Sequence, residues 1–158
     1  MKKIIGSDEL KKFVPLIYFK KKVLVGGCFD IFHYGHLTFL KNARKIGYYL
    51  IVLLECDEFI KKNKKREPIH TQQQRAEILS SIKYVDLIVK LPLLTSDKKY
   101  YDLVKLIKPK IIATTKGDPQ LENKTRQASK VGGELKVVSS LLESYSTQKI
   151  INILRFEL

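Results

Sequence analysis

Cysteines and long apolar runs are scarce in this sequence. It has two cysteines among 158 residues, Cys28 and Cys56, too few for a disulfide scaffold, so we expect reduced thiols and a cytosolic location. No apolar run approaches the roughly 20 residues of a membrane-spanning helix. Asp8 and Glu9 follow the N-terminal lysines where a secretion signal needs an apolar stretch. These absences argue against a secreted scaffold and against a membrane protein.

Internal repeats, low-complexity tracts and a linker rich in proline, glycine and serine are absent as well. Apolar residues make up 44% of the chain and charged residues 29%, the balance of a globular protein and not of a disordered one. The length suits one domain. We therefore expect a single domain over residues 1–158, with an N-terminal helix within residues 1–20 and a catalytic α/β core over residues 21–158.

Acidic residues are few relative to basic ones. Asp and Glu number 16 against 30 Lys and Arg, which gives a formal net charge of +14. Such an excess suits a polyanionic partner, either a nucleic acid or a phosphorylated small molecule. A lysine-rich solvated surface gives the same composition, and Lys reads bases less well than Arg. Charge alone therefore leaves the function open.

Short apolar runs alternate with segments of helical spacing. The runs predict buried strands at residues 23–25, 50–54, 86–91, 111–114 and 135–138. The intervening patterns predict helices at residues 7–19, 35–46, 72–82, 96–108, 121–131 and from 146 onward, with a lysine-rich loop at residues 61–66. This alternation predicts a doubly wound, Rossmann-like α/β sheet of about five parallel strands with helices on both faces. Ligands of such sheets bind beyond the carboxyl ends of the strands.

Two of the three histidines fall in the loop after the first predicted strand. His33 and His36 stand on either side of Gly35 where a helix begins. Unpaired N–H groups and the positive dipole end at a helix start suit phosphate, and Gly35 lets a ligand approach the backbone. Packing or capping histidines are the alternative. A metal site is not expected, because Asp30 is the only obvious further ligand.

Residues 27–36 read Gly-Cys-Phe-Asp-Ile-Phe-His-Tyr-Gly-His, which resembles the HxGH signature of the cytidylyltransferase-like nucleotidyltransferases. Three further stretches resemble the family in the same order, at residues 35–47, 74–86 and 146–151. The resemblance implies transfer of a nucleoside monophosphate from ATP or CTP to a sugar or polyol phosphate, with release of pyrophosphate. It also implies Mg²⁺ bound with the triphosphate and, because family members often dimerise, a homodimer.

Within the family, the chain is most similar to the heptose-1-phosphate adenylyltransferases. The residues at 27–30 and the predicted helix before the first strand carry this similarity. Glycerol-3-phosphate cytidylyltransferases and FAD synthetases are the alternatives; residues 141–147 lack the arginine that the former carry. Lys116-Gly117-Asp118 is poorer in glycine than the family's "KGGD" loop, and Gln148 replaces its last Thr. Outside the class, the alternatives are a basic nucleic-acid-binding module and a relative that binds nucleotide without turnover.

The resemblance also assigns roles to residues. His33 and His36 would donate hydrogen bonds to the triphosphate, and Lys64 would neutralise its α- or β-phosphate, with Lys61 and Lys65 as competitors. Asp30 would orient the loop or bind the acceptor, and Asp57 would bind the acceptor. Nucleotide-binding positions would be Gly27, Cys28, Phe29, Gly35, Arg75, Lys116, Gly117, Asp118, Ser146 and Thr147.

Overall fold

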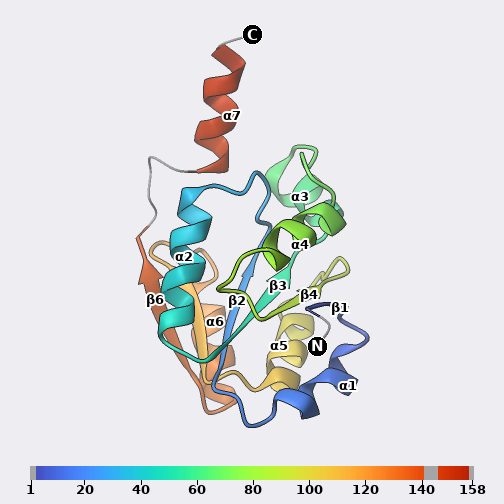
Figure 1. The fold of residues 1–158 in the computed structure, drawn as a ribbon, viewed down its shortest axis with the longest axis vertical. Coiled ribbons are helices and arrows are strands. Elements are labelled where there is room, and N and C mark those ends of the chain that lie inside the picture. The colour runs from blue at the N-terminus through green and yellow to red at the C-terminus, as the bar shows by residue number, and fades with distance from the viewer. Residues whose placement is uncertain (1–2, 141–145, 157–158) are drawn as a thin grey trace.

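A parallel six-stranded sheet forms the centre of the computed structural model, which describes residues 3–140 and 146–156 (Figure 1). The strand order is β1-β4-β3-β2-β5-β6. All five pairings are parallel. The predicted doubly wound α/β class is confirmed. The strands are β1 (Ile4–Gly6), β2 (Lys22–Gly27), β3 (Tyr49–Leu54), β4 (Leu87–Lys90), β5 (Ile111–Thr115) and β6 (Glu134–Ser139).

Helices cover both faces of the sheet. Apolar side chains of α2 (Tyr34–Lys45) and α4 (Gln72–Ser80) pack on one face. Those of α1 (Leu10–Phe13), α5 (Asp97–Ile107) and α6 (Leu121–Lys130) pack on the other. Successive residues of β3 alternate between the two cores, as a strand buried on both faces must. None of the described helices is long and apolar enough to cross a membrane.

The N-terminal segment differs from the expected single helix. Residues 4–6 form the edge strand β1, in register with β4 from Ile4 opposite Ile88, so this segment extends the sheet. The helix predicted over residues 7–19 is the four-residue α1 followed by a 3-10 helix, η1 (Val14–Ile17). Pro15 at the start of η1 lacks the N–H that would continue an α-helix. A three-residue strand is too short for the alternation of apolar and polar residues to be recognised in the sequence, so β1 was not predicted.

The lysine-rich segment is not the loop that we predicted. Most of it lies in α3 (Asp57–Lys64), which ends where Lys65 takes a left-handed conformation with φ 51°. Acidic residues occupy the first turn of α3 and lysines its last turn. This order complements the helix dipole and stabilises the helix. The prediction overlooked this charge order.

The sheet opens at the carboxyl end of β2. Six residues of β2 pair with β3, but only Val23 and Leu24 pair with β5. The ends of β2 and β5 therefore separate, at the point where the strand order reverses. Such a switch point is where open α/β sheets bind ligands. Helix α7 (Thr147–Phe156) lies beyond the carboxyl ends of these strands (Figure 1).

Candidate active site

The loop from β2 to α2 places the two histidines at the switch point. His33 is the N-cap of α2, and its Nδ1 accepts a hydrogen bond from the Gly35 N–H at 3.1 Å. An accepting Nδ1 on a neutral imidazole leaves the proton on Nε2. His33 can therefore offer an N–H donor on the ring side away from the helix. Phe29 and Ile31 in the preceding turn both have φ of 50°, a conformation that apolar side chains rarely adopt.

The two imidazole rings stack on each other. Their centroids are 3.7 Å apart with an interplanar angle of 23°. Phe29 and Phe32 also contact the His36 ring, at centroid distances of 5.2 Å and 5.6 Å. Burial among these rings, together with His33, lowers the pKa of His36 to about 3. Burial lowers the pKa of His33 as well. Both rings are therefore neutral at pH 7, and each neutral ring carries one N–H donor.

Asp30 holds the histidine loop against a second segment. Its buried carboxylate accepts hydrogen bonds from Arg66 at 2.5 Å and from the backbone N–H groups of Ile69 and His70 at 3.1 Å and 3.0 Å. Burial favours a higher pKa for Asp30, but these three donors outweigh it and hold the pKa below its usual value. The contacts are those of a residue that orients the loop. Acceptor binding by Asp30 stays a prediction.

Arg75 lies in the interior of the protein. We predicted that it reaches the triphosphate or helps to shape the nucleotide site, and its side chain is fully buried. Its guanidinium donates to the carbonyls of His70 at 3.1 Å and Cys28 at 2.5 Å, and to the Asp57 carboxylate at 2.7 Å. Thr71 positions Arg75 by opening α4 with a capping box. In this arrangement Arg75 joins α4 to β2 and α3, and Asp57 is an ion-pair partner at the start of α3.

The predicted lysines of α3 follow the carboxyl end of β3, at the same end of the strands as the histidine loop. Lys64 is exposed in the last turn of α3. Burial and the Glu55 charge raise the pKa of the Cys28 thiol to about 11, and the Lys64 charge acts on this thiol in the opposite direction. Lys61, a competitor for the same role, forms an ion pair with Glu67 at 3.0 Å. Lys64 is thus a lysine of α3 whose charge acts on the β2 loop.

Contacts of Asp118 fix the conformation of the loop after β5. Asp118 forms an ion pair with Lys124 at 2.5 Å, accepts from the Gln120 N–H at 2.8 Å and also accepts from the Thr114 hydroxyl. Gly117 has φ of 79°, which suits glycine, and Lys116 is exposed beside it. The loop therefore presents Lys116 toward solvent while Asp118 faces α6.

The start of α7 reaches the histidine loop. The Thr147 hydroxyl donates to the Asp30 carbonyl at 2.9 Å, and the Ser146 hydroxyl caps the helix by accepting from the Lys149 N–H at 3.2 Å. Tertiary structure thus joins residues far apart in the sequence, as Figure 1 shows for α7 and the start of α2. Residues 141–145 of the family-like stretch lie outside the described residues.

Sequence reasoning missed three residues around this site. Arg66 and His70 bind Asp30, and Glu55 follows β3 with its side chain buried. Arg66 is the one arginine in the lysine run, His70 directly precedes a helix cap, and Glu55 directly follows an apolar strand. Each had a local signal, but its partner lies far away in the sequence.

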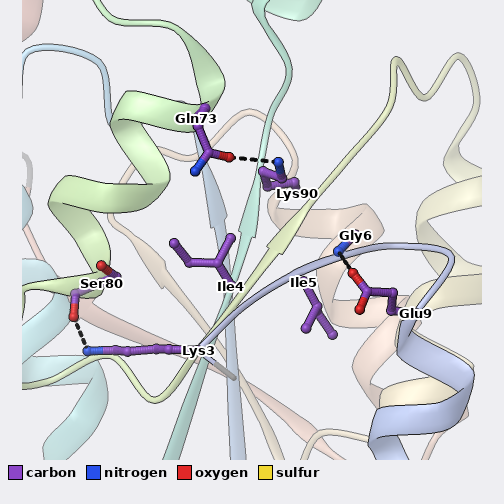
Figure 2. Close-up of a pocket in the computed structure, with 8 residues that line it drawn as sticks. All are labelled: Lys3, Ile4, Ile5, Gly6, Glu9, Gln73, Ser80 and Lys90. Carbon is purple, nitrogen blue, oxygen red and sulfur yellow. Dashed lines mark hydrogen bonds between the residues drawn. The ribbon is translucent and has the colours of Figure 1, made fainter. Parts of the chain in front are cut away.

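Two further features of the described residues were compared with the histidine loop: possible metal ligands, and a hollow beside the edge strand β1. The described residues include no group of three His, Cys, Asp or Glu side chains that could hold a metal. Figure 2 shows the hollow, where Lys3 donates to the Ser80 carbonyl and Lys90 to Gln73. It shares no lining residue with the histidine loop.

A parallel α/β sheet with an HxGH loop at its switch point defines a nucleotidyltransferase. The chain belongs to the cytidylyltransferase-like family, whose family model matches residues 24–151. The chain is 40% identical over 120 residues to "FAD synthase" of Pyrococcus horikoshii, covering 75% of this chain and 79% of that one. It is 38% identical over 149 residues to "Bifunctional protein HldE" of Aliarcobacter butzleri, covering 92% of this chain but 30% of that one.

Solved structures agree with the fold. A lipopolysaccharide core biosynthesis protein from Thermoplasma volcanium superposes with a TM-score of 0.60 at 28% identity, over 76% of this chain and 95% of that one. Pantothenate synthetase from Thermus thermophilus superposes with a TM-score of 0.62 at 15% identity, over 87% of this chain and 61% of that one. The second similarity concerns the fold alone.

Proposed function

We propose that the protein transfers a nucleoside monophosphate from ATP, or alternatively CTP, to a sugar or polyol phosphate. A phosphate oxygen of the acceptor attacks the α-phosphorus, the bond from that phosphorus to the β-phosphate oxygen breaks, and pyrophosphate leaves. The observation that carries this proposal is the stacked pair of neutral imidazoles at the start of α2, at the switch point. A heptose 1-phosphate is the acceptor we favour, because the HldE-named relatives align with 92–96% of this chain.

The histidines stabilise charge in the proposed reaction. The acceptor phosphate is already a nucleophile, so positioning and neutralisation matter more than a general base. His33 Nε2 and the His36 ring donate hydrogen bonds to the triphosphate, beside the N–H groups that open α2. Their neutrality at pH 7 follows from burial. Donors that carry no net charge leave neutralisation to lysines and to Mg²⁺.

The surrounding groups complete the phosphate site in this proposal. Lys64 and Lys116 neutralise phosphate oxygens, and Ser146 and Thr147 hold the β- and γ-phosphates at the start of α7. Mg²⁺ enters as part of the nucleotide substrate and supplies further neutralisation, since the described residues form no cage for it. Arg75 acts as a positioning residue in this scheme, through Cys28 and Asp57. Gly27, Phe29 and Gly35 shape the backbone around the phosphates.

Pyrophosphate release tests the proposal directly. ATP and CTP are each combined with heptose 1-phosphate, glycerol 3-phosphate and FMN in the presence of Mg²⁺. We expect release with ATP and heptose 1-phosphate, and loss of that release in His33→Ala and His36→Ala variants with wild-type circular dichroism. Full turnover in both variants would show that these histidines do not act on the nucleotide.

FMN is the second acceptor, supported by the FAD synthase of Pyrococcus horikoshii at 40% identity. Nucleotide addition to FMN but not to heptose 1-phosphate would assign that activity instead. Steep salt-dependent oligonucleotide binding without nucleotide turnover would favour the basic nucleic-acid-binding alternative. The homodimer and the cytosolic location stay predictions, the first open to sedimentation analysis.

A further inference from the structure

An exposed glycine interrupts the centre of the sheet. Gly26 belongs to β2, which lies between β3 and β5, yet it is exposed in a strand whose preceding residues are buried. Among the described residues, and leaving its chain neighbours aside, a Cβ added to Gly26 would come within 4 Å of only the Leu53 carbonyl oxygen, at 3.9 Å. No other described residue fills the space above Gly26. An open position over a central strand lets a ligand approach the backbone closely.

Strand alternation places this open position on the α5/α6 face. Leu24 packs in the core on that face and Val25 in the opposite core, so Gly26 faces α5 and α6. The histidines open α2, which covers the opposite face. The end of β2 thus lies between the imidazole pair and the space above Gly26.

A buried carboxyl follows the strand that pairs with β2 beside Gly26. Leu53 is the register partner of Gly26, and Glu55 follows two residues later on the same face. The Glu55 side chain is buried and accepts a hydrogen bond from the Tyr100 hydroxyl of α5 at 2.9 Å. Its Oε2 is buried with no hydrogen-bond partner among the described residues. An unpartnered buried carboxyl oxygen costs free energy in the free protein, which a ligand can recover.

Polar side chains also lie on and after β5, the other strand beside β2. Thr114 of β5 lies on the same face and donates to Asp118, which pairs with Lys124 of α6. Burial raises the pKa of Glu55 to about 7, opposed in part by the Tyr100 hydrogen bond and the Lys124 charge, so Lys124 lies within electrostatic reach of Glu55. The Tyr100, Thr114 and Lys124 donors are engaged with carboxylates, so Glu55 Oε2 is the atom of this group left to accept from a sugar hydroxyl.

In-line phosphoryl transfer needs the attacking and leaving oxygens on opposite sides of the phosphorus. With the triphosphate at the imidazole pair, an acceptor above Gly26 would lie across the end of β2 from it, an arrangement that in-line attack allows. We propose that Glu55 is a specificity-determining residue that hydrogen-bonds a hydroxyl of a sugar or polyol phosphate lying above Gly26. This inference rests on the proposed function and adds a specificity-determining residue to the same site.

Two variants test the inference independently. Glu55→Gln replaces one carboxyl oxygen with an amide NH₂ group, and we expect it to raise the KM for heptose 1-phosphate about tenfold, as loss of one hydrogen bond does. Gly26→Ala places a methyl group in the open space without a clash, so we expect an unchanged melting temperature and a raised acceptor KM. The KM for ATP is expected to stay at its wild-type value in both. Glu122→Gln, on the exposed first turn of α6, is the matched control.

Deoxy analogues of the acceptor separate contact from mere packing. The analogue that lacks the contacted hydroxyl is expected to bind equally poorly to wild type and Glu55→Gln, while the other analogues retain the difference. An unchanged acceptor KM in Gly26→Ala, or a rise confined to the KM for ATP in either variant, overturns the inference and leaves the proposed function standing. Wild-type protein that releases no pyrophosphate with any acceptor overturns the proposed function, and this inference with it.

Discussion

Replacing Arg75 with lysine tests whether this arginine is a positioning residue or a phosphate ligand. The guanidinium serves three separate groups, the carbonyls of Cys28 and His70 and the carboxylate of Asp57. A lysine ammonium is a point charge and cannot reproduce this fork. Leaving two buried acceptors without donors costs about 1–3 kcal/mol each. We therefore expect Arg75→Lys to lower the free energy of unfolding by about 3 kcal/mol.

Urea unfolding followed by circular dichroism measures this loss. For a chain of this length, about 3 kcal/mol corresponds to a fall in melting temperature of roughly 6–12 °C. Arg126→Lys is the matched control, because Arg126 is exposed and its ion pair with Asp97, at 3.1 Å, contributes less than about 1 kcal/mol. Arg75→Lys with wild-type stability and no nucleotide turnover would refute the reasoning, and would restore Arg75 as a direct phosphate ligand.

Three further predictions concern residues around the histidine loop, at the carboxyl ends of the strands. Unfolded His36 gains a proton below its ordinary pKa of 6.5, but the folded ring does so only near pH 3. Stability therefore falls as pH drops between these values, by up to about 1.4 kcal/mol per pH unit. Urea midpoints at pH 7, 6 and 5 measure this fall, and His36→Phe should flatten the slope. Asp30→Asn should weaken the Arg66 contact and speed proteolysis at residues 61–70; an unchanged digest would contradict that role. Lys64→Ala should raise the KM for ATP while Lys62→Ala does not, and equal effects would point to general surface charge.

The α/β class and the histidine loop were predictable because their signals are local. Apolar runs alternating with helical spacing predict a parallel sheet from neighbouring residues alone. The HxGH pattern lies within one turn, and Thr71 caps its helix through Gln74, three residues away. The order of charges along α3 was equally local, and it was overlooked.

The partners of the buried polar groups could not be predicted in this way. Asp30 meets Arg66, Arg75 meets Cys28, and Glu55 meets Tyr100, each across more than thirty residues of sequence. No periodicity connects such positions, because strand order and helix packing bring them together. The sequence alone therefore determined strands β2 to β6 and the position of both histidines at the start of a helix. Only the tertiary structure decided that Arg75 is buried and that the α5/α6 side of β2 is open, since burial depends on which elements pack against each other.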